Sequence, residues 1–485
     1  MVGIPITALL HFGVVFALSF RILYRRLAVN TTLAWIIIIA ALPIGGIMLY
    51  FLFGDHRLGR KRLKLGPRIR QYYQSAYDIT DEDADGAHMD VSTFFEDLSD
   101  IVSAETGFYP SMGNSGELFQ NAELTLEALM RDIDSAKENC FLEFYIIQAR
   151  GRVVPVLEAL ERAAIRGVDC RILADDFGSG AFFKCKWHDR LVQAGVKIVR
   201  SLPVGLIKSL SKRTDLRNHR KIVIIDQSIG YIGSFNLVDP AMFKKKADVG
   251  EWVDIMLRIE GHIVSSLACV FNTDFIFDNY GADFDRHALR AMPQQTPSEE
   301  FSLNAVAQLI PSGPEMRSSL IYEVIVSAIF GAREQITIIT PYFVPDEALL
   351  MAMSNAARRG LDVRLILPKK IDSKLARYAG ESVFEGLLES GVEIFRFNAG
   401  MLHTKAILID DSVSFIGTVN MDMRSFYLNL EVTLAIYDTR FSAQLAHIAA
   451  GYIAQSDCID LKTWRQRTKF LQFKENVLRL TAPLL

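Results

Sequence analysis

The chain contains the segment His219-Arg-Lys-Ile-Val-Ile-Ile-Asp226 and, later, the segment His403-Thr-Lys-Ala-Ile-Leu-Ile-Asp410. Each is followed by a glycine, a hydroxyl residue and an asparagine, in Gly233-Ser-Phe-Asn236 and Gly417-Thr-Val-Asn420. In both copies lysine stands two positions after histidine, aspartate seven, glycine fourteen, the hydroxyl residue fifteen and asparagine seventeen. One such match would mean little, but the repeated spacing of six residue types indicates an internal duplication.

The sequence around the two motifs repeats as well. The phrase Ala163-Ala-Ile-Arg-Gly-Val-Asp-Cys-Arg171 is matched by Ala356-Ala-Arg-Arg-Gly-Leu-Asp-Val-Arg364. Each phrase ends a helical pattern and begins an apolar strand pattern. Because strands alternate with helices in both copies, we predict an α/β fold with two pseudo-symmetric halves, each a mixed sheet flanked by helices.

Composition and periodicity divide the chain into four parts. We predict a hydrophobic hairpin in residues 1–60, a connecting arm in 61–106, a first half in 107–292 and a second half in 301–485. The segment from His287 to Glu300 contains two prolines and is predicted to be the linker between the halves.

Two apolar runs without charged residues lie in the hairpin, Ile4–Phe20 and Leu33–Phe53. At about 1.5 Å per helical residue the second run is about 31 Å long and can cross a bilayer, while the first, at about 25 Å, is marginal. Basic residues are concentrated after the second run, so we predict two membrane spans with the larger part of the chain facing the cytoplasm. A signal peptide is the alternative for the first run, but the basic residues that normally begin one are missing.

Charge and cysteine content exclude several classes of protein. The net charge is −3, which gives no overall basic surface for nucleic acid. The five cysteines include no CxxC pair, so neither a disulfide framework nor a zinc ribbon is indicated.

The residue types of each motif suit a phosphate diester. Four apolar residues separate lysine from aspartate, so each motif should open a buried strand on which histidine and lysine point the same way. The aspartate at the far end should project elsewhere or cap a turn. Lysine neutralises phosphate oxygens, hydroxyl and amide groups add hydrogen bonds, and imidazole, with a pKa of about 6.5, serves as nucleophile or as proton donor.

We therefore predict one site assembled from both copies. Its candidate catalytic residues are His219, Lys221, Asp226, His403, Lys405 and Asp410. Its candidate phosphate-binding or orienting residues are Ser234, Asn236, Thr418, Asn420, Glu251 and Glu431. The two glutamates lie downstream of the asparagines and precede apolar runs, and we expect each to hold Nδ1 of the histidine in its own half.

The motifs do not suit a metal centre. An ammonium group two residues from each histidine repels a divalent cation, and no carboxylate cluster with ligand spacing is present in the sequence. The sequence also lacks the GxxxxGK[ST] phosphate loop of nucleotide-dependent enzymes. We predict a site that uses neither metal nor cofactor.

At these residues the chain resembles the phospholipase D superfamily, whose signature is HxK, an aspartate and then GS/TxN. More narrowly, the phrases Arg217-Asn-His-Arg-Lys221, Gly233-Ser-Phe-Asn-Leu-Val-Asp-Pro240 and Pro341-Tyr-Phe-Val-Pro345 are similar to those of bacterial cardiolipin synthases. The likeness extends from about Phe108 to Leu485, and the N-terminal hairpin is similar too. The distance from asparagine to glutamate is longer in the first half, so Glu251 fits the family pattern less well than Glu431.

The resemblance implies a reaction and a location. Two phosphatidylglycerols would give cardiolipin and glycerol through a phosphohistidine, with His219 as nucleophile and His403 as general acid and then base. The sequence itself does not distinguish the roles of the two histidines. The resemblance implies an enzyme of the bacterial cytoplasmic membrane that binds phosphatidylglycerol and other anionic lipids and no nucleic acid.

Three alternatives remain open at this stage: a phospholipase D or nuclease with water as acceptor, a phosphatidyltransferase with another alcohol acceptor, and a membrane scaffold without activity. The oligomeric state is not readable from the sequence. The segment Leu461–Leu485 interleaves basic and aromatic residues and is predicted to be an amphipathic element able to lie on anionic lipid, with an ordinary solvated helix face as the alternative.

Overall fold

The computed structural model describes residues 6–25, 29–54, 69, 73, 93–203, 216–280, 305–314, 316 and 319–482. Several sequence features lie outside these residues. They are the predicted linker beyond Tyr280, most of the connecting arm, the basic stretch after the hairpin, and residues 204–215 just before the first motif.

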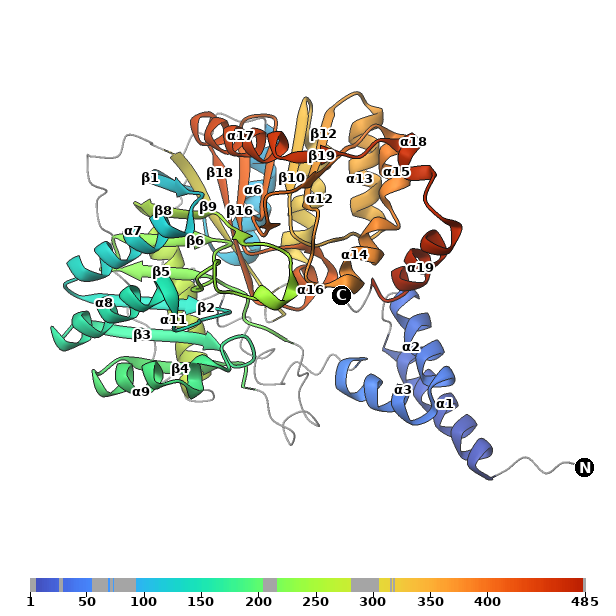
Figure 1. Cartoon of the computed structure of the whole chain (residues 1–485), viewed down its shortest axis with the longest axis horizontal. Coiled ribbons are helices and arrows are strands. Elements are labelled where there is room, and N and C mark those ends of the chain that lie inside the picture. The colour runs from blue at the N-terminus through green and yellow to red at the C-terminus, as the bar shows by residue number, and fades with distance from the viewer. Residues whose placement is uncertain are drawn as a thin grey trace, which may run out of the picture.

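The first half alternates strands and helices along most of its length (Figure 1). Its elements are β1 (Ser111–Phe119), α7 (Ala122–Ser135), β2 (Asn139–Phe144), α8 (Val154–Ile165), β3 (Asp169–Asp175), α9 (Lys186–Gln193), β4 (Lys197–Ser201), β5 (Ile222–Ile225), β6 (Ile229–Gly233), β7 (Trp252–Val253), β8 (Met256–Glu260) and α11 (Ile263–Tyr280).

The second half repeats this order and adds short elements both within it and at its end. Its elements are α6 (Thr93–Thr106), β9 (Ala305–Ser312), α12 (Leu320–Gly331), β10 (Gln335–Ile339), β11 (Phe343–Val344), α13 (Glu347–Arg358), β12 (Asp362–Pro368), α14 (Lys374–Glu381), α15 (Phe384–Ser390), β13 (Glu393–Phe397), β14 (Met401–Leu402), β15 (Ala406–Ile409), β16 (Val413–Gly417), β17 (Met421–Asp422), α16 (Met423–Tyr427), β18 (Glu431–Tyr437), α17 (Thr439–Ala454), β19 (Ser456–Cys458), α18 (Leu461–Arg465) and α19 (Lys469–Arg479). Helix α6 precedes the first half in the sequence but packs against α12 and β9 of the second, and it is given with that half.

One continuous sheet of 15 strands joins the two halves, in the order β19-β13-β12-β10-β15-β16-β18-β9-β1-β8-β6-β5-β2-β3-β4. The order is the same read outward from the central β9–β1 pair in either direction, apart from β19 at one edge. In each half three outer strands pair in parallel and the inner ones pair antiparallel. The predicted α/β fold, with a mixed sheet flanked by helices, is confirmed.

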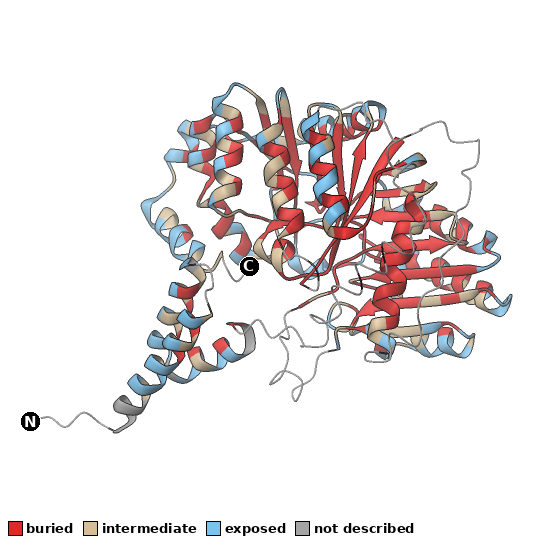
Figure 2. Ribbon diagram, turned by 180° about the vertical axis from the view of Figure 1, so that it is seen from behind, coloured by how far each residue is buried: buried red, intermediate tan, exposed pale blue. Residues whose placement is uncertain are grey.

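Helices cover both faces of the sheet, and the strands between them are buried on both sides (Figure 2). On one face α11 and α17 share a core that continues across both halves. On the other face α7 and α8 cover the first half, while α6, α12 and α13 cover the second. Strand β5 shows the consequence, because Ile222 and Ile224 enter one core while Val223 and Ile225 enter the other. Burial on both faces explains why each motif contains an unbroken apolar run.

The N-terminal hairpin differs from the prediction. Its elements are α1 (Ile6–Tyr24), α2 (Val29–Ala41), α3 (Pro43–Leu49) and the π-helical turn η1 (Tyr50–Gly54). The run predicted to be one continuous span is broken, because Leu42 is extended before Pro43 and a proline has no N–H to continue the helix. Helix α3 therefore folds back against α2 (Figure 1). Within the described residues, no helix combines the length and the apolar character that crossing a membrane requires.

Candidate functional site

The two motifs begin at equivalent ends of β5 and β15. Their histidines lie just before these strands, and each is held by a backbone segment of the opposite half. The backbone N–H of His219 donates to the carbonyl of Leu430 at 2.8 Å, and that of His403 donates to the carbonyl of Val253 at 2.7 Å. Leu430 and Val253 are therefore equivalent positions, and the residue after each is an acid, Glu431 or Asp254.

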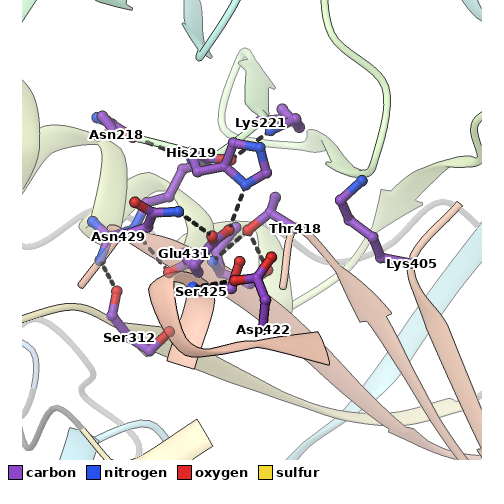
Figure 3. Close-up of polar contacts among 12 residues, drawn as sticks. Asn218, His219, Lys221, Ser312, Lys405, Thr418, Asp422, Ser425, Asn429 and Glu431 are labelled. Carbon is purple, nitrogen blue, oxygen red and sulfur yellow. Dashed lines mark hydrogen bonds and ion pairs between the residues drawn. The ribbon is translucent and has the colours of Figure 1, made fainter. Parts of the chain in front are cut away.

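Each histidine is hydrogen-bonded through Nδ1 to that acid of the other half. The distance from His219 Nδ1 to Glu431 Oε2 is 2.9 Å (Figure 3). The distance from His403 Nδ1 to Asp254 Oδ1 is 2.7 Å. Both carboxylates are buried, with Glu431 0% and Asp254 7% exposed. The pairing within one half that we expected is wrong, because the backbone just before each acid pairs with the other half: Leu430 bridges to Asn218, and β7 pairs with β14.

Glu251 does not take the orienting position predicted for it. The residue is exposed, and its contact with the second half is its backbone carbonyl, which accepts the N–H of Met401 at 2.8 Å. Asp254 holds the position instead. A signal for Asp254 was present in the sequence, because it immediately precedes the apolar strand Ile-Met-Leu in the way that Glu431 precedes Val-Thr-Leu.

The two hydroxyl residues orient the acids. Ser234 Oγ donates to Asp254 Oδ1 at 2.6 Å. Thr418 Oγ1 accepts the backbone N–H of Val432, next to Glu431, at 2.9 Å. A second contact supports Glu431, because Asn429 Nδ2 donates to its Oε1 at 3.2 Å (Figure 3). Neither acid is therefore free to turn away from its histidine.

The two asparagines of the motifs differ from one another. Asn236 Oδ1 accepts the backbone N–H of Ile146 at 3.2 Å. Asn420 is 6% exposed, and its Oδ1 has no hydrogen-bond partner within the described part of the chain. Asn236 therefore fixes the loop after β2, whereas the amide of Asn420 retains hydrogen-bonding capacity inside the site.

The two lysines are buried beside the histidines. Lys221 Nζ donates to the carbonyl of His219 at 2.6 Å, and Lys405 Nζ donates to that of His403 at 2.7 Å. Burial lowers the pKa of Lys221 to about 7 and that of Lys405 to about 8. The charge of each lysine lowers the pKa of the other half's histidine, so the four groups lie within electrostatic reach of one another and form one site. Figure 3 shows His219 with Lys221 of its own half and Lys405 of the other half.

Both imidazoles are neutral near pH 7. Burial lowers the pKa of His219 to about 4 and that of His403 to about 3, although the paired carboxylate raises each pKa in part. The hydrogen bond to the acid places the proton on Nδ1, which leaves the lone pair on Nε2. This is the form of imidazole that attacks an electrophile.

Known proteins match both the motifs and the hairpin. A model of "Cardiolipin synthase, PLD-like domain" matches residues 129–274 and 325–451, and a model of "Phospholipase_D-nuclease N-terminal" matches residues 13–54. Cardiolipin synthase A of Erwinia tasmaniensis is 38% identical over 489 residues, covering 98% of each chain. Cardiolipin synthase A of Proteus mirabilis is 37% identical over 483 residues, covering 99% of this chain and 98% of that one.

The chain belongs to the cardiolipin synthase family of phospholipase D-like proteins. The resemblance noted from the motifs is thereby confirmed. Among solved structures, phosphatidylserine synthase of Haemophilus influenzae superposes with a TM-score of 0.59 at 14% identity, covering 81% of this chain and 100% of that one. That likeness concerns the fold of two joined halves alone.

In this cardiolipin synthase-family chain, the aspartates of the two motifs lie away from the histidines. The carboxylate of Asp226 accepts the backbone N–H groups of Lys137, Glu138 and Asn139 at 2.7–3.2 Å. Asp410 accepts those of the equivalent residues 333–335 at 2.8–3.1 Å. Both cap the turn that leads into the neighbouring strand, β2 or β10, at the far end of the motif strand. The structure therefore does not bring them to the histidines as catalytic residues.

Replacing Asp226 should therefore weaken folding and leave the chemistry intact. Asp226 has a φ of 50°, which asparagine tolerates, so Asp226→Asn removes the charge without backbone strain. We expect a loss of about 1–3 kcal/mol in the free energy of unfolding, measured by thermal unfolding in detergent, with unchanged turnover per folded molecule. The matched control is Asp411→Asn, at an exposed aspartate with a φ of 52°. A loss of turnover without a loss of stability would contradict this structural role.

Sequence reasoning missed several residues around the histidines. The Trp252 ring lies 4.0 Å from that of His403, and the Tyr145 ring lies edge-on at 5.1 Å from that of His219. Arg220, 1% exposed, donates from Nε to the backbone carbonyl of Glu431 at 3.0 Å and forms a buried ion pair with Asp274. These residues carry no periodic signal, since their contacts come from distant parts of the chain.

The described residues contain no cluster of three or more histidine, cysteine or acidic side chains that could hold a metal ion. The imidazoles, ammonium groups and amides at the site can act on a phosphodiester directly. The carboxylates are occupied in orienting the histidines.

Proposed function

We propose that this chain is a cardiolipin synthase, which transfers a phosphatidyl group from one phosphatidylglycerol to another and releases glycerol. The observation that carries the proposal is the pair of imidazoles, each fixed through Nδ1 by a buried acid and accompanied by a buried lysine. Two such imidazoles can carry out the two steps of a phosphodiester exchange without an external source of energy. The relatives named above are described as cardiolipin synthases, which supports the choice of substrate.

In the first step His219 Nε2 attacks phosphorus, and the bond from phosphorus to the glycerol oxygen breaks. His403 gives its proton to the departing glycerol. The anionic phosphate beside His403 favours the protonated imidazole and so supplies the proton donor. In the second step neutral His403 takes the proton from a glycerol hydroxyl of another phosphatidylglycerol, whose oxygen attacks phosphorus and breaks the phosphorus–nitrogen bond.

An asymmetry between the halves supports this assignment of roles. Lys405 Nζ lies 3.1 Å from His403 Nε2 and can donate to the lone pair that an attack would need. For His219, Nε2 has no hydrogen-bond partner among the described residues, and its side chain is 10% exposed against 3% for His403. His219 is thus the imidazole with the accessible lone pair. The two lysines, with Asn420, would hold the phosphate oxygens.

We also propose that the N-terminal helices anchor the chain in the bacterial cytoplasmic membrane, with the catalytic part on the cytoplasmic side. Helix α1 supports this, because Phe12, Phe16 and Phe20 are 68–76% exposed on it. Such a surface is suited to acyl chains rather than to water. An anchored site would remain at the surface where its lipid substrates reside.

A product assay tests the proposed function. The full-length protein in detergent micelles would be given labelled phosphatidylglycerol, with EDTA and without nucleotide, and the lipids would be resolved by mass spectrometry. We expect cardiolipin and glycerol in equal amounts. Phosphatidic acid and glycerol without cardiolipin would mean that water is the acceptor, and the proposal of a synthase would be rejected. Inhibition by EDTA would reject the metal-independent mechanism.

A further inference from the structure

Helix α19 carries an exposed apolar stripe at its outer side. Phe470, Phe473, Val477 and Leu480 are 77%, 65%, 44% and 72% exposed. At about 100° per residue these four positions fall within an arc of about 80°. Such an arrangement is the apolar face of an amphipathic helix, and none of the described residues covers it.

The opposite side of α19 fixes the helix to the catalytic part. Glu475 is 1% exposed and is paired with Arg467 at 2.6 Å. Helix α19 packs against α14, where Lys474 Nζ lies 4.0 Å from the centre of the Tyr378 ring. These contacts on its inner side hold the helix in one orientation, and the stripe faces outward as a result.

The charges around the stripe match an anionic surface. Lys469 and Lys474 lie on either side of it. The acid of the helix, Glu475, is buried and neutralised by Arg467. An apolar stripe bordered by lysines is suited to the boundary between headgroups and acyl chains of an anionic bilayer.

The position of α19 in the fold connects it to both the hairpin and the site. In Figure 1 it lies on the same side of the molecule as helices α1–α3. Helix α14, beneath α19, packs against β11, and β11 pairs with β17 directly after Asn420. A bilayer contacting α19 would thus be near the hairpin and near the strand end that leads into the site.

We propose that the stripe of α19 inserts into an anionic bilayer as a second membrane contact, which orients the catalytic part so that lipid substrates can reach the histidines. This inference rests on the proposed action on a membrane lipid. The hairpin alone ties the chain to the membrane at one end. A second contact restricts rotation of the catalytic part, so its loss should reduce turnover of lipid in a bilayer and leave turnover of dispersed lipid unchanged.

The test compares Phe473→Asp with Asn476→Asp in the full-length protein. Both substitutions add one negative charge at an exposed position of α19, but Asn476 lies outside the stripe. We measure turnover of phosphatidylglycerol in phosphatidylcholine–phosphatidylserine vesicles, and of short-chain phosphatidylglycerol in detergent micelles. Phe473→Asp should lose about tenfold or more in vesicles, with micellar turnover within about twofold of the parent protein. Asn476→Asp should stay within about twofold in both.

Two further measurements make the result specific. The fluorescence of the tryptophan in Phe470→Trp, after subtraction of the signal of the native tryptophans, should be quenched by brominated acyl chains in the same vesicles. The fluorescence of the tryptophan in Gln466→Trp, at an exposed position outside the stripe, should not be quenched. Equal vesicle activity of the two aspartate variants, or no quenching at position 470, would overturn the proposal. So would loss of a dimer on Phe473→Asp in light scattering, since a second copy would then cover the stripe. Absence of micellar turnover in the parent protein would instead contradict the proposed function.

Discussion

Replacing either histidine, in His219→Ala or His403→Ala, should reduce cardiolipin formation by roughly four orders of magnitude or more. Each imidazole acts in both chemical steps, so the remaining one cannot compensate for its loss. The measurement is turnover of labelled phosphatidylglycerol in micelles, per molecule of folded protein. The two variants should still differ in one respect. His403→Ala retains the proposed nucleophile and should accumulate a trace of phosphohistidine, detectable by intact mass, whereas His219→Ala should not.

The control for both variants is His447→Ala, at an exposed position on α17. It should retain full turnover, and thermal unfolding should show that all three variants remain folded. Near-normal activity of either site variant would contradict a mechanism with two histidines. A phosphohistidine in His219→Ala, but not in His403→Ala, would reverse the assigned roles while leaving the mechanism in place.

The second large effect concerns the acids that orient the histidines across the halves. Glu431→Gln and Asp254→Asn should each reduce turnover by about 10²- to 10⁴-fold, because the imidazole loses the carboxylate that fixes its tautomer and stabilises its protonated form. Glu251→Gln should have little effect, since that side chain is exposed and does not orient a histidine. Glu251→Gln is therefore the matched control for Asp254→Asn, because it removes the charge of an acid from the same segment.

Nuclear magnetic resonance of the histidine nitrogens distinguishes crossed pairs from pairs within one half. Glu431 raises the pKa of His219 and Asp254 raises that of His403. Glu431→Gln should therefore lower the pKa of His219 further and remove the strongly hydrogen-bonded Nδ1 proton signal of His219, while the signal of His403 persists. Asp254→Asn should do the reverse. Loss of the His403 signal in Glu431→Gln would contradict the crossed arrangement.

Much of the fold was predictable because it depends on local periodicity. The apolar runs at Ile222–Ile225 and Ala406–Ile409 are buried on both faces, and this burial alone makes them continuous in the sequence. The repeated helix–strand phrases likewise predicted two equivalent halves. The helix break inside the second N-terminal run was not predicted, because a mean hydropathy does not register Pro43, whose missing N–H ends the preceding helix.

Several residues of the site were also predictable from the sequence, because a polar pattern that occurs twice at the same spacing indicates side chains with a shared function. The sequence by itself was enough to name the two histidines, the two lysines and one of the two orienting acids, Glu431, as residues of the site. Spacing along a strand also indicated that Asp226 and Asp410 could cap turns. Only the tertiary structure decided that they do so, because the backbone amides that they accept belong to the turn before a different strand, far away in the chain.

The tertiary structure alone decided which acid serves which histidine. Sequence reasoning pairs groups that are near one another along the chain, and so it assigned each acid to the histidine of its own half. In the fold, Leu430 and Val253 pair with the backbone of the opposite half, and that pairing carries Glu431 to His219 and Asp254 to His403. Such contacts depend on how the two halves of the sheet are joined, and this leaves no period or spacing in a single sequence.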